Sequence, residues 1–180
     1  MLSSQIPKRV VVAFPRIEDA AEWNQILSVR DRFDPLAGKV APHLTLASPF
    51  EDSRSDLALE QHLRTALADV HGFAVTLRGV TVHEGEYLFL NVKRGNDALV
   101  LLHDTLYAEV LAAHRVRTHT FVPHVTIGRL SGKDLPVALD ATSGLTSTIQ
   151  ATVGSVSVYR VEADGTRPVL FELPLLPPSF

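Results

Sequence analysis

The segment APHLTLASPF, residues 41–50, places a histidine and a threonine two positions apart in a stretch that is typical of a β-strand. The pattern returns at residues 123–127 as PHVTI, again with an aliphatic residue after the histidine and after the threonine. From the residue frequencies of this chain, a match to proline, histidine, aliphatic, threonine, aliphatic is expected on the order of a few times per thousand chains. Two copies indicate an internal duplication or a task that both segments share.

Alternation along a strand explains why the two polar residues are spaced in this way. Successive side chains of a strand point to opposite faces, so His43 and Thr45 lie on one face and the leucines that follow them lie on the other. His124 and Thr126 are presented together in the same manner. Each motif therefore anchors its aliphatic side chains in a core and offers an imidazole and a hydroxyl side by side.

The composition is that of a globular domain. Of the 180 residues, 46% are apolar and 21% are charged, and the formal net charge is −3. This charge argues against a protein that coats nucleic acid, because such binding needs many lysine and arginine contacts to phosphate. The chain has no cysteine, which excludes disulfides, thiolate metal sites and thiol nucleophiles. It shows neither a signal-peptide pattern nor an apolar run that could span a bilayer, so we expect a soluble, cytoplasmic protein.

Strands and helices interleave along the chain without a linker. Strands are predicted at residues 8–15, 43–47, 73–77, 80–83, 87–92, 124–130, 148–161 and 169–173. Helices are predicted at residues 17–30, about 53–70, 96–113 and 133–141. Short connections between strands favour antiparallel pairing, so the sequence predicts an α+β fold. The recurring motif suggests a single domain, residues 1–180, made of two lobes near 1–93 and 94–180.

Two imidazoles and two hydroxyls form a set of groups that can open a phosphodiester without a metal. Histidine titrates close to neutral pH, so a neutral imidazole can take a proton while a protonated one gives a proton to a leaving oxygen. Threonine hydroxyls can donate hydrogen bonds to the non-bridging oxygens of an anion held between them. The pattern therefore favours general acid–base chemistry on a phosphate ester.

These motifs resemble those of the two-histidine (2H) phosphoesterases, which include proteins called 2′-5′ RNA ligases and RNA 2′,3′-cyclic phosphodiesterases. The hallmark of that family is a pair of H-x-[ST]-hydrophobic motifs separated by about half the chain, here HLTL at 43–46 and HVTI at 124–127. The closing segment VYRVEADGTRPVLFELPL, residues 158–175, is also similar to the family.

The resemblance implies a bilobal fold with pseudo-twofold symmetry, in which duplicated antiparallel sheets with flanking helices line a central cleft. It implies that His43 and His124 are the catalytic acid–base pair and that Thr45 and Thr126 bind the substrate phosphate. It also implies a nucleotide or RNA end as substrate. We expect no cofactor, no metal, no membrane association and no stable protein partner.

Arg129 follows the second motif at a position that is family-like, and a guanidinium suits phosphate binding. Strict alternation places it on the face opposite His124, but a bulge at Gly128 could redirect it. A solvated arginine at the end of a strand is the alternative. The first motif has Ser48 at the corresponding offset, so the halves are not equivalent there.

The remaining histidines allow other interpretations. His114, His119 and His124 are close in sequence and could hold a metal, although their spacing matches no familiar metal motif. Four others are expected to be solvated on helices or turns: His62, His71, His83 and His103.

The sequence thus predicts a metal-independent phosphoesterase that hydrolyses a nucleotide or RNA 2′,3′-cyclic phosphate or a related 2′-5′ phosphodiester. The resemblance leaves 2′-5′ RNA ligase activity open as well. Three alternatives remain: a non-catalytic module that binds a nucleotide or RNA phosphate, a metal-dependent hydrolase, and a purely structural repeat.

Overall fold

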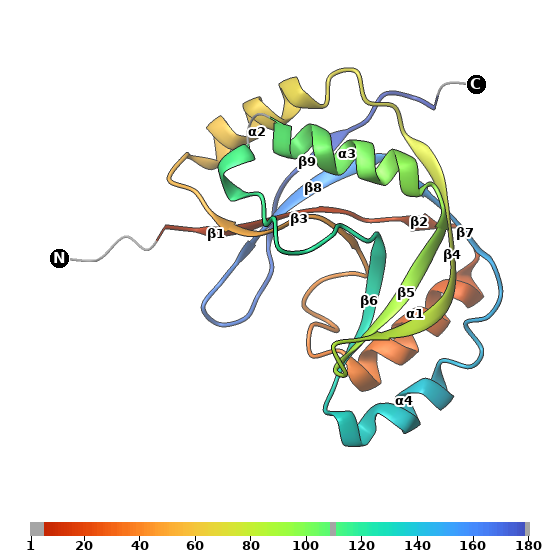
Figure 1. Ribbon diagram of the computed structural model, residues 1–180. Coiled ribbons are helices and arrows are strands. Elements are labelled where there is room, and N and C mark those ends of the chain that lie inside the picture. Colours follow the sequence, from red (N-terminus) through yellow and green to blue (C-terminus); the bar gives the residue numbers. More distant parts are fainter. Residues whose placement is uncertain (1–5, 109–110, 179–180) are drawn as a thin grey trace.

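A single antiparallel sheet of nine strands forms the framework of the computed structural model, which describes residues 6–108 and 111–178. The strands follow the order β2-β7-β4-β5-β6-β3-β1-β8-β9, and every neighbouring pair is antiparallel. Their bounds are β1 Lys8–Ala13, β2 Arg16–Ile17, β3 Leu44–Glu51, β4 Phe73–His83, β5 Tyr87–Arg94, β6 His124–Arg129, β7 Ile149–Val153, β8 Ser155–Val161 and β9 Val169–Pro174. Together with its helices, this curled sheet makes an α+β fold, as the sequence predicts (Figure 1).

The helices lie in two groups against the sheet. Their bounds are α1 Ala20–Phe33, α2 Asp56–Ala66, α3 Asn96–Ala108 and α4 Leu135–Ala141, with short 3₁₀ turns at Ala112–His114 and Gly132–Asp134. Figure 1 shows α2 with α3 over one part of the sheet and α1 with α4 against the other. In particular, α3 contacts β3 and α1 contacts β6. Among the described residues, no helix combines the length and the apolar character that crossing a membrane requires.

The first helix begins later than predicted because of its cap. The carboxylate of Asp19 accepts hydrogen bonds from the backbone N–H groups of Ala21 and Glu22, at 2.8 and 3.1 Å, and so fixes the start of α1. Ile17 was predicted to be helical and instead pairs with Ala151 of β7. The helix predicted to reach residue 113 is described as far as Ala108; residues 109–110 lie outside the described part of the chain.

Two predicted strand boundaries also differ. The strands predicted at 73–77 and 80–83 form one strand, β4, whose pairing with β5 is irregular around Gly79. Gly79 has a φ of 74°, a conformation that other residues adopt with strain. The strand predicted at 148–161 is divided into β7 and β8 at Gly154.

The two helix-backed parts of the sheet meet where β3 pairs with β6. One part holds β2, β7, β4, β5 and β6, and the other holds β3, β1, β8 and β9. Each part therefore combines strands from the first and the second half of the chain. The lobe boundary predicted near residue 93 falls inside β5, in the interior of the sheet, so the chain halves do not coincide with these parts.

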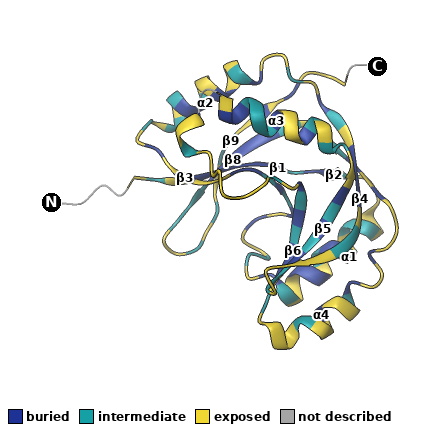
Figure 2. Cartoon of the chain, viewed as in Figure 1, coloured by how far each residue is buried: buried dark blue, intermediate teal, exposed yellow. Residues whose placement is uncertain are grey.

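The aliphatic residues of both motif strands are in the core, as predicted. Leu44, Leu46, Val125 and Ile127 are at most 1% exposed and belong to one continuous hydrophobic cluster. Figure 2 shows the corresponding pattern, with burial concentrated on the strands and exposed residues on the outer faces of the helices. The opposite faces of the motif strands remain available for polar groups.

Candidate active site

The two motifs meet at a single pair of residues. Leu44 of β3 pairs with Val125 of β6 in an antiparallel arrangement, although the two residues are far apart in the sequence. Both side chains point into the hydrophobic core. The neighbours of each residue therefore point to the opposite, polar face of the sheet.

Continuing this register by one residue on each side pairs the polar groups across the strands. Thr45 then lies opposite His124, and His43 lies opposite Thr126. All four side chains share one face, and each is partly exposed. The two histidines are diagonal neighbours, a relationship that corresponds to roughly 7–8 Å between backbone positions. The sheet thus brings together the four motif residues that the sequence singled out.

Arg129 is turned onto the same face by a register slip. Thr126 pairs with Phe89 of β5, whereas Arg129 pairs with Tyr87, so Ile127 is an extra residue in β6. Tyr87 and Phe89 are two residues apart and face the same way, and their partners in β6 must do so too. A bulge is thus present in β6, at Ile127, one residue before the position expected from Gly128.

The surroundings of Arg129 leave it accessible. Its side chain is 55% exposed, and its Nε lies 3.5 Å from a carboxylate oxygen of Glu86. Its guanidinium carbon is 5.2 Å from the centre of the Tyr87 ring. The arginine is therefore at the rim of the polar face, beyond Thr126.

The first motif strand contains the same slip. Thr45 pairs with Val12 of β1, but Ala47 pairs with Val11, so Leu46 is the extra residue. This brings Ser48 to the same face as Thr45, at the place that Arg129 has in β6. The two ends of the polar face are thus related in backbone geometry. The end formed by β3 carries the hydroxyl of Ser48, and the end formed by β6 carries the guanidinium of Arg129.

Both histidines are held by the same kind of hydrogen bond. The Nδ1 of His43 lies 2.8 Å from the carbonyl oxygen of Ala41, and the Nδ1 of His124 lies 2.7 Å from that of Val122. A carbonyl oxygen only accepts, so Nδ1 carries the proton in each ring. In both motifs a proline separates the histidine from this carbonyl, and its fixed φ restrains the segment. Among the described residues, the hydrogen bonds of these two rings involve Nδ1, so each Nε2 is available to accept or donate a proton.

Aromatic rings enclose the two imidazoles. The ring of His43 makes edge contacts with Phe14 and Tyr159, at centroid distances of 6.0 and 5.8 Å. The ring of His124 is stacked on Phe89 at 3.5 Å. These neighbours fix the ring orientations and exclude water from one side of each imidazole.

This burial lowers the pKa of both histidines. For His43, desolvation has the largest effect, the carbonyl of Ala41 opposes it, and the charges of Arg30 and His124 lower the pKa further. For His124, desolvation again dominates, and the charge of His83 adds to it. Both rings are therefore predominantly neutral at neutral pH. The effect of one motif histidine on the other reflects how close they are.

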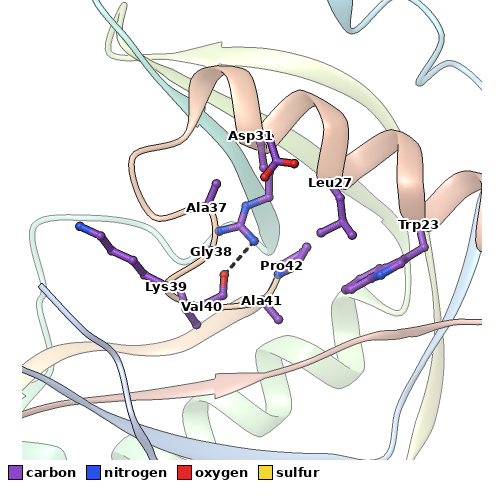
Figure 3. A pocket seen from close by; sticks show the side chains of 10 residues that line it. Trp23, Leu27, Asp31, Ala37, Gly38, Lys39, Val40, Ala41 and Pro42 are labelled. Carbon is purple, nitrogen blue, oxygen red and sulfur yellow. Dashed lines mark hydrogen bonds between the residues drawn. The ribbon is translucent and has the colours of Figure 1, made fainter.

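A buried ion pair supports the segment that leads into His43. Arg30 of α1 donates from Nε to Asp34 at 2.7 Å and from a terminal nitrogen to the carbonyl of Val40 at 2.9 Å. The second bond is the dashed line that ends at Val40 in Figure 3. A cavity of about 280 Å³ lies here between α1 and this segment, with Trp23 among its lining residues (Figure 3). Arg30 thus positions the backbone before the first motif.

A second cavity, of about 290 Å³, adjoins the motif residues themselves. It is lined by Thr45 and His124, by Ser48, by His103 and Tyr107 of α3, and by residues of the segment 116–122. His103 was predicted to be solvated, but its side chain is only 13% exposed and its ring is stacked on Phe121 at 4.1 Å. The helix places this histidine inward, on the side that also carries Leu99 and Leu106.

The histidines proposed as an alternative metal cluster are not gathered around one point. His114 lies 3.6 Å from a carboxylate oxygen of Asp52 and packs on Phe50, whereas His119 lines the cavity next to His124. Within residues 6–108 and 111–178, no group of three or more histidine, aspartate or glutamate side chains is arranged to hold a metal ion.

A family model described as the 2′-5′ RNA ligase superfamily matches residues 16–165, a range that includes both motifs. The chain belongs to this superfamily. Among its relatives, a protein of Geobacillus sp. (strain WCH70) that is provisionally named a phosphoesterase is 35% identical over 133 residues. This match covers 71% of the present chain and 70% of the relative.

Two solved structures share the fold of this chain. LigT of Escherichia coli, crystallised with NADP⁺, has a TM-score of 0.64 and 18% sequence identity, covering 96% of this chain and 99% of LigT. Usb1 of Kluyveromyces marxianus, solved with uridine monophosphate, has a TM-score of 0.51 and 15% identity, covering 96% of this chain and 99% of Usb1. The α+β fold predicted for the chain is thereby confirmed, and the family supports phosphoesterase activity.

Proposed function

We propose that this member of the 2′-5′ RNA ligase superfamily hydrolyses the 2′,3′-cyclic phosphate of a nucleotide or RNA end, or a related 2′-5′ phosphodiester, by two-histidine acid–base catalysis. One observation carries the proposal: Leu44 of β3 pairs with Val125 of β6, and this register, continued by one residue in each direction, sets each motif histidine opposite the threonine of the other motif. In this arrangement His43, Thr45, His124 and Thr126 surround one place on the polar face of the sheet.

The four groups match the needs of a bound phosphodiester. The hydroxyls of Thr45 and Thr126 donate hydrogen bonds to the two non-bridging oxygens. The free Nε2 atoms of His43 and His124 approach the phosphorus from opposite sides, where the attacking and departing oxygens of an in-line displacement lie. Arg129, at the rim, contributes positive charge toward the same anion.

The reaction on a cyclic phosphate then needs two proton transfers. One histidine takes a proton from water at its neutral Nε2 while the water oxygen forms a bond to phosphorus. The bond from phosphorus to one ribose oxygen breaks, and the other histidine gives its Nε2 proton to that oxygen. The product is a nucleoside phosphate monoester. The one proton that the two Nε2 atoms share between them is now on the histidine that acted as the base.

The neutral resting state of the histidines is compatible with this cycle. Burial lowers the pKa of each ring, so both are available as bases. A bound phosphodiester carries a negative charge, and this charge favours one proton on the pair. Activity should consequently require one protonated and one neutral imidazole and give a bell-shaped dependence on pH.

The nucleotide part of the proposal draws on similar proteins. LigT of Escherichia coli has been crystallised with 3′-AMP, and Usb1 of Kluyveromyces marxianus with uridine monophosphate. Both ligands are nucleoside monophosphates, the class of compound that hydrolysis of a cyclic phosphate produces. We therefore expect a nucleoside 2′,3′-cyclic phosphate or an RNA end that carries one as the substrate.

The test compares His43→Gln and His124→Gln with the wild-type chain on nucleoside 2′,3′-cyclic monophosphates and on a 2′-5′-linked dinucleotide. Each variant should lose roughly 10²- to 10⁴-fold in kcat, the usual contribution of a positioned acid or base. His62→Gln changes an exposed histidine of α2 and should leave the rate unchanged. Unfolding curves establish that the variants remain folded.

Other outcomes would contradict the proposal in distinguishable ways. Full activity of His43→Gln on every substrate that is turned over would exclude the acid–base pair. Tight binding of the cyclic phosphates without any product would instead indicate a non-catalytic binding module. Loss of activity on treatment with a chelator, restored by a divalent metal, would indicate a metal-dependent hydrolase.

A further inference from the structure

The cavity between α3 and the segment 116–122 has a lining that differs from a phosphate site. Of the described residues that line it, none is a lysine, arginine, aspartate or glutamate. At one end it reaches Thr45 and His124, so it begins where the proposed phosphate position ends. A ligand group attached directly to that phosphate would enter the cavity, and no lysine or arginine among the described lining residues would neutralise a second negative charge there.

The walls offer apolar and aromatic surfaces. Val116 and Val122 are 49% and 58% exposed, which is high for valines that border a cavity. The ring of Phe121 is stacked on His103 at an interplanar angle of 14°, and the ring of Tyr107 lies 4.8 Å from the same imidazole. These surfaces suit a flat aromatic group, because stacking and apolar contact do not require complementary charge.

Polar groups on the same walls are held in defined orientations. The Nδ1 of His103 lies 3.1 Å from the carboxylate of Asp104, which also accepts a hydrogen bond from Arg115 at 2.8 Å. The Nδ1 of His119 lies 3.0 Å from the hydroxyl of Thr118. In both imidazoles Nε2 has no protein partner among these bonds and is available to bond the edge of a ligand.

We propose that this cavity, lined by His103, Tyr107, Val116, His119 and Phe121, is a nucleobase subsite for the nucleoside attached to the scissile phosphate. The inference rests on the proposed function for the location of that phosphate and goes beyond it by orienting the substrate. The base occupies the end of the polar face that carries Ser48. The opposite end of the polar face, where the corresponding bulge in β6 presents Arg129, would accommodate additional negative charge of the substrate.

A second phosphate is a poorer occupant of this cavity, because it would be desolvated without a cation. A purely aliphatic group is also a poorer occupant, because the imidazoles and the hydroxyl of Thr120 would lose their hydrogen bonds to water without replacement. A nucleobase combines an apolar face with hydrogen-bonding edges and matches both features.

The experiment compares two probes that differ only in the base: a nucleoside 2′,3′-cyclic monophosphate and methyl ribofuranoside 2,3-cyclic phosphate. Wild-type protein should favour the base-bearing probe by roughly 5- to 150-fold in kcat/KM, the range expected for one stacked base. Val116→Trp fills the cavity from an exposed position and should remove most of this preference. Val137→Trp makes the same change on α4, at a valine that is 59% exposed, and should retain the preference.

Binding measurements separate this inference from the proposed function. Calorimetric titration with a nucleoside 3′-monophosphate and with ribose 3-phosphate needs no turnover, so it judges the subsite even if cyclic phosphates are not substrates. Weaker binding of the nucleotide to Val116→Trp, with ribose phosphate affected less, supports the subsite. Equal affinity of the wild-type protein for both ligands, or an equal loss for both in the variant, overturns it.

Discussion

The imidazole of His124 lies flat against the phenyl ring of Phe89, with the ring centroids 3.5 Å apart and the planes inclined by 19°. On its other side, Phe89 is stacked on His83 at 4.9 Å. The stack removes one face of His124 from water, and the charge of His83 acts on the same ring. Both effects disfavour the imidazolium form and lower the pKa of His124.

Replacing Phe89 should therefore raise the pKa of His124. Phe89→Ala exposes the imidazole to water, which relieves the desolvation that keeps the pKa low. The limb of the activity profile that His124 governs should therefore move to higher pH: the acidic limb where His124 is the base, and the alkaline limb where it is the acid. Phe89→Tyr keeps the ring and should keep the wild-type profile. NMR titration of the His124 ring protons measures the pKa directly, and an unchanged value in Phe89→Ala would refute this role for the stack.

The motif threonines should contribute to phosphate binding through their hydroxyls alone. Thr126→Val and Thr45→Val preserve the β-branched shape and remove a hydrogen bond to a charged group, which costs about 1.5–3 kcal/mol. We expect kcat/KM to fall roughly 10- to 100-fold, and Thr126→Ser to recover most of it. Thr105→Val, at a partly buried threonine of α3 that is not among the residues lining the cavity beside the motifs, serves as the control. Wild-type kinetics in both valine variants would rule out a hydroxyl–phosphate contact.

The two motif histidines should make folding stability depend on pH. Their pKa values are lowered from 6.5 in the folded protein, so the unfolded chain takes up protons first as the pH falls. Their contribution to the free energy of unfolding is complete above about pH 6.5 and is lost below it as the pH approaches the folded pKa values. Urea unfolding at pH 7.5 and pH 5 should show a larger loss in the wild-type protein than in a His43→Gln/His124→Gln double variant. An equal loss of unfolding free energy in both proteins would contradict the lowered pKa values of the two histidines.

The buried pair of Arg30 and Asp34 should be important for both stability and the first motif. Arg30→Met leaves an uncompensated carboxylate, 4% exposed, and should lower the free energy of unfolding by about 3–5 kcal/mol. It also removes the hydrogen bond to the carbonyl of Val40. Turnover should become slower because the segment that positions His43 loses this support. Arg16→Met breaks an exposed pair with Glu18 and should cost at most about 1 kcal/mol. Denaturant unfolding of both variants provides the comparison, and similar losses would disprove the anchoring role.

Much of the local structure could be predicted because it depends on local patterns. The alternation of residues 43–46 and 124–127 correctly predicted buried aliphatic and accessible polar faces. The start of the first helix was predicted less accurately, because the hydrophobic pattern begins at Ile17 whereas the side-chain cap at Asp19 starts the helix at Ala20. The bulge near Gly128 could be suspected from the glycine, but only strand pairing shows that the slip occurs and that Arg129 turns with it.

The surroundings of the site had weaker signals. Phe14, Tyr159 and Phe89 read as ordinary aromatic residues of strands, and nothing local indicates that their rings enclose the motif histidines. His103 looked like a solvated helix residue, although a polar residue on the apolar side of a helix was a possible sign of its inward position. The catalytic roles of His43 and His124 stay a prediction that the activity measurements above will decide.

By itself, the sequence determined that each motif presents a histidine and a threonine on one face of a strand, because side-chain alternation is a property of the local backbone. The tertiary structure alone decided that Leu44 pairs with Val125 and that His43 and His124 therefore share one polar face. This pairing joins two segments that are about 80 residues apart in the sequence. It depends on the packing of α1 and α3 against the sheet and on the register of the strands, β4 and β5, that lie between β3 and β6 along the chain. No short stretch of the chain encodes that information.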